Sequence, residues 1–267
     1  MPINQCGLWS FTKLKIGIII PARLDSERLP GKVLKDFLGM PMIEHVWRRA
    51  QLTDPILETI IATDSVDIKK IAEAFGATCM LTSNNHNNGL SRVGELANQL
   101  QWDYYIVLQA DEILIEPESL NTLARITTSN SNFDFFNLIT KLELPGEIND
   151  VNIVKCLVRK NNTVITMARK SNSVAPESDQ MQYTKKICGV YSCSNQILTK
   201  LINTTAQKIE NAESIEQMRV IEIGNSIFGV AIDKSYPSVN TSSEAALALS
   251  ILQTDSQQKR ILSSYKR

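Results

Sequence analysis

Short apolar runs alternate with helical patterns through the first half of the chain. The runs are typical of strands that are buried on both faces, and they predict strands at residues 15–20, 59–62, 78–81 and 104–109. Apolar residues at helical spacing lie between them and predict helices at residues 41–52, 65–75 and 91–100. Strands that alternate with such helices pair in parallel. The pattern therefore predicts an α/β fold with a doubly wound, mostly parallel sheet.

The second half of the chain has a different pattern. Three strands without helices between them are expected, at residues 151–159, 164–168 and 186–194. They predict a small antiparallel insertion over residues 143–194, inside a single domain of residues 1–267. The polar, serine-rich stretch 170–182 within it is expected to be a loop. Helical spacing returns at residues 215–221 and again from Ser243 onward.

The composition excludes several classes of protein. The 28 basic and 28 acidic residues give zero net charge, which argues against a nucleic-acid surface or a polybasic membrane anchor. The apolar run at 16–20 is too short to span a membrane, and the first fifteen residues lack the pattern of a secretory signal. Five scattered cysteines and two histidines disfavour a disulfide framework and a zinc site. We expect a cytoplasmic protein that binds neither nucleic acid nor membrane.

The neutral total conceals two segments of opposite charge. Residues 101–118 contain five acidic side chains and no lysine or arginine, a net charge of −5. Residues 151–190 contain seven basic and two acidic side chains, a net charge of +5. An acidic strand end suits a metal ion, and a basic segment suits an anionic substrate. This distribution favours a crevice for small charged molecules.

A loop with three cations follows the first predicted strand. Arg23, Arg28 and Lys32 lie within residues 21–32, which read PARLDSERLPGK. One guanidinium group can bind two phosphate oxygens at once, and lysine adds a point charge. The loop has neither a Walker A sequence nor GxGxxG, so those two phosphate-binding mechanisms are unsupported. The alternative is a solvated loop in which Asp25 and Glu27 neutralise the cations.

A carboxylate follows the predicted strand at 104–109, in the sequence Gln109-Ala110-Asp111-Glu112. Ligands of parallel α/β sheets bind beyond the carboxyl ends of the strands, so this loop and the cationic loop are expected to face one crevice. Asp111 is well placed to hold Mg²⁺ against a polyphosphate. The alternative is that Asp111 only caps a helix.

A third polar group lies near residue 215. Glu213, Glu216 and Gln217 have the spacing of one helical face. Their side chains could hydrogen-bond sugar hydroxyls. The residues alone favour the alternative, a solvated helix surface.

Motifs from residue 15 to about residue 249 resemble, in the same order, those of the CMP-Kdo synthetase family, the 3-deoxy-manno-octulosonate cytidylyltransferases. The family patterns PARxxSxRLPGK, GxPMIxHV, IxATD and HxSGTxR have counterparts at residues 21–32, 39–46, 60–64 and 86–92. QGDEP, NxVK, FSR, GIY and LEQLR have counterparts at residues 109–113, 152–155, 167–169, 189–191 and 215–219. The first motif is shared with other sugar-acid nucleotidyltransferases, whereas the ordered set is much more specific.

The resemblance implies the fold of nucleotide-diphospho-sugar transferases and a homodimer. It also implies Mg²⁺-dependent transfer of CMP from CTP to a 3-deoxy-octulosonic acid, Kdo or an amino-Kdo relative. Pyrophosphate would be released, and the product would serve lipopolysaccharide or surface-polysaccharide biosynthesis. The anomeric hydroxyl of the sugar would attack the α-phosphorus in line, so catalysis would consist mainly of positioning and charge neutralisation.

The resemblance also implies roles for individual residues. Arg23, Arg28 and Lys32 would hold the triphosphate, Asp111 would carry Mg²⁺, and Gln109 would order the nucleotide or the sugar. The segment from His86 to Arg92 would lie near the cytosine and the dimer contact. The pocket for the sugar acid would be lined by Arg169, Tyr191, Glu213, Glu216 and Gln217.

The chain departs from the family pattern at several positions. The family sequence GVDTPEDL has an aspartate that resembles a second metal ligand, and this chain has Asn240 there. An amide oxygen is a weaker ligand of Mg²⁺ than a carboxylate. Ala110 and Ile113 replace the glycine and proline of QGDEP, and the histidine before GIY has no clear counterpart.

These departures leave two alternatives. The chain could be a weakly active or inactive paralogue that binds a cytidine nucleotide, or it could act on a different sugar acid. A glycosyltransferase of the GT-A type is disfavoured, because the sequence at Asp111-Glu112 has no DxD pattern.

Overall fold

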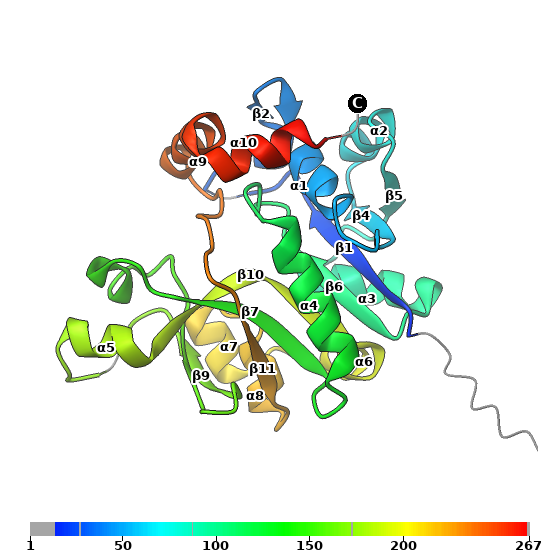
Figure 1. Cartoon of the computed structure of the whole chain (residues 1–267). Helices are drawn as coiled ribbons and strands as arrows, with labels where there is room; N and C mark the ends of the chain where they lie inside the picture. Colours follow the sequence, from blue (N-terminus) through cyan, green and yellow to red (C-terminus); the bar gives the residue numbers. More distant parts are fainter. Residues whose placement is uncertain (1–13, 27, 87, 172, 266–267) are drawn as a thin grey trace, which may run out of the picture.

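The computed structural model describes residues 14–26, 28–86, 88–171 and 173–265, and a nine-stranded sheet lies at its centre (Figure 1). Residues 1–13, which carry Cys6 and most of the stretch inspected for a secretory signal, lie outside the described residues. Seven strands lie side by side in the order β11 (Ile227–Ala231), β7 (Phe135–Lys141), β10 (Thr184–Ser194), β6 (Tyr104–Leu108), β1 (Ile16–Ala22), β4 (Thr59–Thr63), β5 (Thr78–Leu81). The remaining two strands, β8 (Lys155–Val158) and β9 (Val164–Ala168), extend the sheet beside β10.

The strands of the central sheet run mostly in one direction. β1 is parallel to β4 and β6, β4 is parallel to β5, and β7 is parallel to β11. β10 is antiparallel to both β6 and β7, so it alone runs against the other six strands of this row. The predicted α/β class and the mostly parallel sheet are therefore confirmed.

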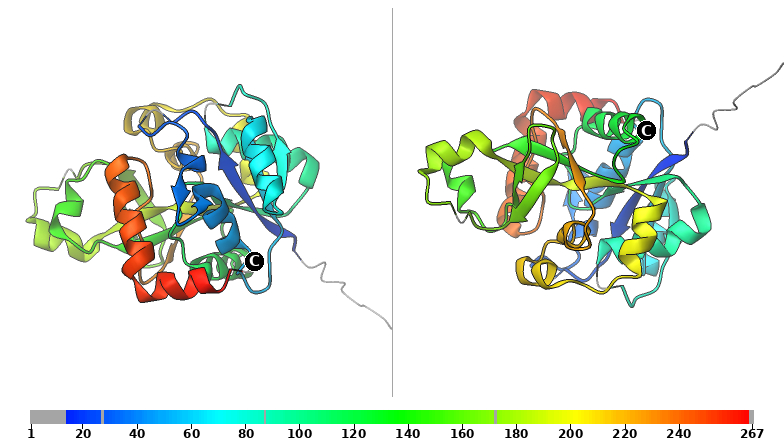
Figure 2. Two further views of the ribbon diagram at one scale, coloured as in Figure 1. Left: turned by 90° about the horizontal axis from the view of Figure 1, so that it is seen from above. Right: turned by 90° about the horizontal axis from the view of Figure 1, so that it is seen from below.

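Apolar side chains cover both faces of the sheet, which explains why the strands read as unbroken apolar runs. Ile18 and Ile20 of β1 lie in one buried cluster, and Ile19 between them lies in the other. One face is covered by α1 (Met42–Ala50), α2 (Val66–Ala74), α4 (Pro117–Ser129) and α9 (Ser242–Thr254). The other is covered by α3 (Gly89–Leu100), α6 (Asn195–Ile202) and α8 (Met218–Glu222), and the two views of Figure 2 show these opposite sides.

The ends of two predicted helices have clear physical causes. Ser65 precedes α2, and its Oγ accepts a hydrogen bond from the Ile68 N–H at 3.2 Å. Gly76 follows the helix with a φ of +89°, which favours glycine. α3 begins at Gly89, two residues earlier than expected, because Asn88 caps it by accepting from the Ser91 N–H at 2.9 Å.

The predicted antiparallel segment is continuous with the central sheet. Thr184–Lys186 at the start of β10 pair with β8, whereas Val190–Ser194 at its end pair with β6. The register of β10 against β7 shifts between Ile187 and Tyr191. The third strand of the segment therefore also belongs to the centre of the sheet, and a division into one domain with a lobe at 143–194 stays a prediction.

Some elements differ from the expectations. The stretch 170–182 was expected to be a loop, but α5 (Glu177–Tyr183) begins within it. The helix expected at 215–221 begins only at Met218, as α8, and a separate helix, α7 (Lys208–Glu213), ends before it where Ser214 has a φ of +52°. The sequence patterns also did not predict α4, β7, α6 or β11.

The C-terminal part of the chain forms two helices above one face of the sheet. α9 is followed by α10 (Ser256–Ser263), and both lie near α1 in Figure 1. Short pieces β2 (Asp36–Phe37) and β3 (Met40–Pro41) form a separate two-stranded sheet before α1. In the part of the chain that the structure describes, no helix is long and apolar enough to cross a membrane.

Candidate functional site

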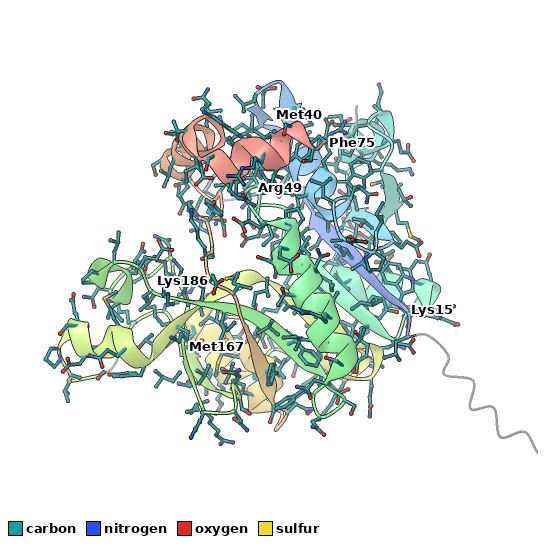
Figure 3. All side chains as sticks on the ribbon, viewed as in Figure 1. Lys15, Met40, Arg49, Phe75, Met167 and Lys186 are labelled. Carbon is teal, nitrogen blue, oxygen red and sulfur yellow. The ribbon has the colours of Figure 1, made fainter. Side chains whose placement is uncertain are left out.

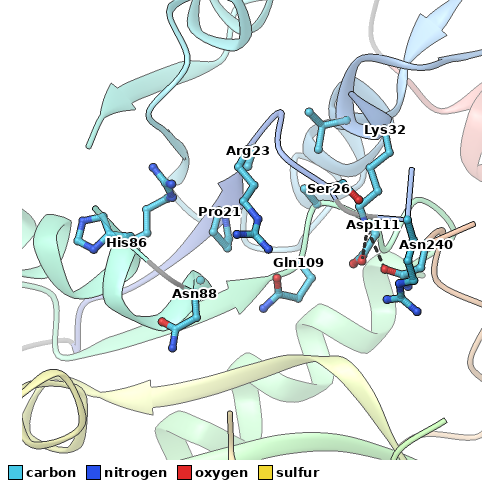
Figure 4. A pocket seen from close by; sticks show the side chains of 15 residues that line it. Pro21, Arg23, Ser26, Lys32, His86, Asn88, Gln109, Asp111 and Asn240 are labelled. Atoms are coloured by element: carbon cyan, nitrogen blue, oxygen red, sulfur yellow. Dashed lines mark hydrogen bonds and ion pairs between the residues drawn. The ribbon is translucent and has the colours of Figure 1, made fainter. Parts of the chain in front are cut away.

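A polar cavity of about 320 Å³ lies beyond the carboxyl ends of β1 and β6. It brings together the cationic loop, the loop after β6, the start of α3 and the segment before α9, as the crevice prediction required (Figure 4). Its polar lining residues are Arg23, Ser26, Arg28, Lys32, His86, Asn88, Arg92, Gln109, Asp111 and Asn240.

Lys32 connects three segments of this cavity. Its Nζ donates to Asp111 Oδ2 at 2.8 Å, to Asn240 Oδ1 at 2.8 Å and to the Val239 carbonyl at 3.0 Å (Figure 4). Gly31, with a φ of +65°, makes the turn that begins the short 3-10 helix Lys32–Leu34. The Val239 N–H in turn donates to the Asp111 carbonyl at 3.0 Å, so the two oxygen-bearing segments are also joined to each other.

Asp111 does not act as a helix cap. The cap residue of α4, the next helix, is Glu116, and the carboxylate of Asp111 contacts the Lys32 ammonium instead. The Asp111 side chain is one-fifth exposed and that of Lys32 is 14% exposed, so the ion pair is partly protected from water. The alternative that we gave for Asp111 is therefore wrong.

The oxygen atoms around Lys32 are of the kind that bind Mg²⁺. A carboxylate, a side-chain amide and a backbone carbonyl all point at one position, which the ammonium takes in this structure. Mg²⁺ is usually held by one or two carboxylates together with substrate phosphates and water. Among the residues that the structure describes, no group of three or more His, Cys, Asp or Glu side chains is arranged so that it could hold a metal ion by itself. The donors at Asp111 and Asn240 thus fit a metal that is shared with a bound polyphosphate.

The two arginines of the cationic loop are exposed at the cavity. Arg28 Nη1 donates to Asn152 Oδ1 at 3.2 Å rather than to the nearby Asp25. Glu27, the other acid that was considered as a neutralising partner, lies outside the described residues. The charge of Arg28 also lowers the pKa of Arg169, after burial, which is the larger cause. Positive charge therefore extends from the cavity toward Arg169.

The N-terminus of α3 faces the cavity. Gly89 lies so close that an added Cβ would come within 3.2 Å of Pro21 and 3.4 Å of the Gln109 side chain. The unpaired N–H groups and the dipole of a helix start favour a nearby anion. His86 pairs with Glu95, and the buried Arg92 forms an ion pair with Asp64 at 3.0 Å.

The sequence placed Glu112 in a motif but predicted no role for its side chain. It is 7% exposed and accepts from the Gly189 N–H at 3.1 Å and from Ser238 Oγ at 2.7 Å. Burial, and then the charge of Asp111, raise the pKa of Glu112 to about 7. An added Cβ at Gly189 would lie 2.4 Å from Glu112 Oε1, so the Glu112 carboxylate packs directly against this glycine and would have to shift if it were replaced. Glu112 thus fastens the Asp111 loop to β10 and to the segment before Asn240.

The residues predicted to bind the sugar acid form a second group outside the described lining of the cavity. Glu216 accepts from the Leu90 N–H of α3 at 2.9 Å and from the Tyr191 hydroxyl at 3.5 Å. Gln217 Nε2 donates to the buried Asn137 Oδ1 at 3.4 Å. Glu213 does not share a helical face with these two residues, because the chain turns at Ser214. The alternative of a solvated helix surface is also wrong for Glu216, since its carboxylate bonds within the protein.

Arg169 uses its guanidinium on backbone carbonyls. Its Nε donates to the Glu213 carbonyl at 2.7 Å, and its Nη1 and Nη2 donate to those of Val151 and Ser214, each at 2.9 Å. The Arg169 N–H also donates to Glu213 Oε2 at 3.0 Å. Arg169 therefore anchors the turn before Glu216, and its predicted contact with a sugar acid stays a prediction.

We expect Glu216 to make stability depend on pH. Burial raises the pKa of Glu216 from its ordinary value of 4.5 to about 7. Between these two pH values, the Glu216 carboxyl is therefore protonated in the native state and ionised in the unfolded state. Stability contributed by this proton is present below about pH 4.5 and falls as pH rises to about 7. Denaturant unfolding should show that Glu216→Gln removes about 1–3 kcal/mol of this decline.

The exposed Glu58 provides the matched control. Glu58→Gln should leave the pH dependence of the unfolding free energy as it is in the wild type. A Glu216→Gln variant with the wild-type slope between pH 4.5 and 7 would contradict the assignment of this proton to Glu216.

Comparisons with known proteins show which family this chain resembles. A family model described as Cytidylyltransferase matches residues 17–227. The 3-deoxy-manno-octulosonate cytidylyltransferase of Chlorobium limicola is 34% identical over 238 residues, which cover 88% of this chain and 96% of that protein. The enzyme of the same name from Escherichia coli is 30% identical and covers 85% of this chain and 92% of its own. The 8-amino-3,8-dideoxy-manno-octulosonate cytidylyltransferase of Shewanella pealeana is 28% identical over 91% of this chain.

Solved structures show the same likeness. The structure of CMP:2-keto-3-deoxy-manno-octonic acid synthetase complexed with CTP matches with a TM-score of 0.84 and 29% identity, over 90% of this chain and 99% of that one. The inositol-1-phosphate CTP transferase of T. maritima has a TM-score of 0.70 at 11% identity, which indicates a shared fold only.

Proposed function

The chain belongs to the cytidylyltransferase family, and on this premise we propose that it transfers CMP from CTP to a 3-deoxy-octulosonic acid, Kdo or an amino-Kdo relative. Pyrophosphate is released, and the product serves lipopolysaccharide or surface-polysaccharide biosynthesis. The observation that carries the proposal is the contact of Lys32 with Asp111 and Asn240 inside a cavity that Arg23 and Arg28 also line. A homodimer and a cytoplasmic location are part of the same proposal.

The residues of the cavity suit nucleotidyl transfer without a covalent intermediate. The anomeric hydroxyl oxygen of the sugar forms a bond to the α-phosphorus of CTP and loses its proton to solvent, while the bond from that phosphorus to the pyrophosphate oxygen breaks. Negative charge increases on the leaving pyrophosphate, and Arg23, Arg28 and Lys32 stabilise it. The N-terminus of α3 adds positive potential on the other side of the cavity. Positioning and charge neutralisation thus supply the rate enhancement.

Two of the cavity residues would hold Mg²⁺. Asp111 offers a carboxylate oxygen and Asn240 an amide oxygen, and the metal when bound would neutralise charge on the triphosphate. Lys32 would then transfer its hydrogen bonds from these oxygens to phosphate oxygens. Gln109, which follows β6 and lines the cavity, would order the nucleotide or the sugar.

The acceptor is proposed to lie toward the second group of residues. Glu216 and Tyr191 adjoin the start of α3 through Leu90, and Gln217 lies beside them. Their carboxylate, hydroxyl and amide groups suit the hydroxyls of a sugar, and the positive charge of Arg28 and Arg169 suits its carboxylate.

Initial rates of pyrophosphate release from CTP test the proposal. They should be measured with Kdo, 8-amino-Kdo and a nonulosonic acid, each with Mg²⁺ present. We expect release with one of the two octulosonic acids and a much lower rate with the nonulosonic acid. Release with the nonulosonic acid alone would move the substrate to a different sugar acid.

Asn240→Asp is expected to lower the Mg²⁺ concentration that gives half-maximal rate by about 10-fold, since a carboxylate replaces a neutral ligand. Titration of Mg²⁺ at saturating CTP measures the change. Ser243→Asp, which adds the same charge at an exposed position of α9, serves as the control and should have little effect.

The amide of Asn240, where the family has a carboxylate, also favours the weak paralogue as second candidate. A large gain in maximal rate with Asn240→Asp would support that candidate, and an unchanged, already high rate would exclude it.

A further inference from the structure

The loop that carries Asp111 is held at its far end by buried side chains from other elements. Gln258 of α10 donates through Nε2 to the Leu114 carbonyl at 3.0 Å. Arg49 of α1 donates through Nη1 to the Ile115 carbonyl at 2.8 Å. Arg49 Nη2 also donates to Gln258 Oε1 at 2.6 Å, so the two side chains act together. Both Gln258 and Arg49 are fully buried, and Figure 3 shows Arg49 beside the C-terminal helix.

The same helical unit also holds Asn240. Thr241 caps α9, and Glu244 within its first turn accepts from the Asn240 N–H at 2.7 Å. α9 leads directly into α10, where Asp255 Oδ1 accepts from the Gln257 and Gln258 N–H groups, each at 2.9 Å. This pair of helices therefore contacts Asn240 at the start of α9 and the Asp111 loop in the first turn of α10.

Two buried polar side chains, Arg49 and Gln258, make this contact, although apolar side chains alone could pack the helices together. A fully buried guanidinium is costly, and burial is the main cause that lowers the pKa of Arg49. Arg49 Nε has no hydrogen-bond partner among the described residues, which adds to the cost. Apolar residues would pack helices together more cheaply, whereas a guanidinium and an amide fix the direction of two carbonyl groups.

We propose that Gln258 and Arg49 are positioning residues, which set the separation of Asp111 and Asn240 by joining the α9–α10 unit to the loop after β6. The inference rests on the proposed function for its kinetic consequence. Residues that orient the ligands of a metal affect its affinity by about 10- to 100-fold when they are changed. Gln258 is not among the described residues that line the cavity, and it contacts the Asp111 loop through the Leu114 carbonyl.

The test compares Gln258→Met with Gln257→Met, which makes the same change at an exposed position of the same helix. Hydrogen–deuterium exchange should become faster over residues 109–116 and 239–244 in Gln258→Met, with β1 and β4 unchanged. Gln257→Met should match the wild type. In the kinetic assay, Gln258→Met should raise the Mg²⁺ concentration for half-maximal rate by about 10-fold and change kcat at saturating Mg²⁺ by less than about 2-fold.

Other outcomes would overturn the inference. A lower thermal stability with unchanged exchange at 109–116 and an unchanged Mg²⁺ requirement would show that Gln258 only anchors α10. Gln258→Glu serves if the methionine variant does not fold, because it keeps an acceptor for Arg49 and loses the donor to Leu114. Unchanged protection of 109–116 in that variant would also overturn the inference. The exchange measurement needs no turnover, so it remains decisive if the wild type releases no pyrophosphate and the proposed function fails.

Discussion

Lys32→Met is expected to lower kcat/KM for pyrophosphate release from CTP by about 100- to 1,000-fold, the usual effect of removing one group that stabilises transition-state charge. The Lys32 ammonium is within hydrogen-bond distance of Asp111, Asn240 and Val239, so it lies where the triphosphate and its metal would meet. Its loss removes a positive charge and leaves the Asp111 carboxylate without this partner. Steady-state kinetics with CTP and the preferred sugar acid measure the effect.

Lys35→Met is the matched control for this variant. Lys35 is exposed, adjoins the same short helix and is not one of the residues that line the cavity. We expect wild-type kinetics for it. Lys32→Arg, which keeps the charge but changes its geometry, should retain part of the activity. A wild-type rate in Lys32→Met would show that the ammonium only fills a metal position and takes no part in catalysis.

Arg28→Ala is expected to lower kcat/KM by about 10- to 100-fold while the fold stays intact, because a hydrogen bond to a charged group contributes about 1.5–3 kcal/mol. The Arg28 side chain is exposed at the cavity, and its contact is with the side chain of Asn152, which is exposed too. Surface substitutions of this kind change stability by about 0.5 kcal/mol or less. Kinetics and thermal unfolding of the same preparation separate the two effects.

Arg159→Ala provides the comparison, because Arg159 is exposed at the end of β8 and does not line the cavity. Its kinetics and unfolding temperature should equal those of the wild type. Arg28→Ala with unchanged pyrophosphate release would remove Arg28 from the site. A large drop in its unfolding temperature would mean that the contact with Asn152 is structural.

The first half of the fold could be predicted because its physics is local. β1, β4 and β6 are buried on both faces, so each appears as an apolar run, as Ile18 and Ile19 in opposite clusters illustrate. β10 could be recognised as a strand, but its place between β6 and β7 depends on a pairing such as Tyr191 with Val107, far away in sequence. The turn at Ser214 is also invisible to helical spacing, because that spacing continues through it.

The cavity was predictable for a related reason. Parallel strands bring their carboxyl ends to one edge, so the loops that carry Lys32 and Asp111 were expected to face one crevice. The structure places them there and adds a direct contact between the two side chains at 2.8 Å, which was not predicted. The orientation of Arg169 toward carbonyl groups was not predictable, because charge alone does not identify a partner. Glu112, Arg49 and Gln258 were missed as well, since their partners are mainly backbone and hydroxyl groups from distant segments.

The most direct test of the proposed reaction is to identify its products by ³¹P nuclear magnetic resonance and mass spectrometry. CTP, Mg²⁺ and Kdo or 8-amino-Kdo should yield a CMP-linked sugar acid and pyrophosphate in equal amounts, and CTP without a sugar acid should stay intact. Intact CTP with every 3-deoxy-ulosonic acid, at high enzyme concentration, would contradict the proposal that this chain transfers CMP to such an acid.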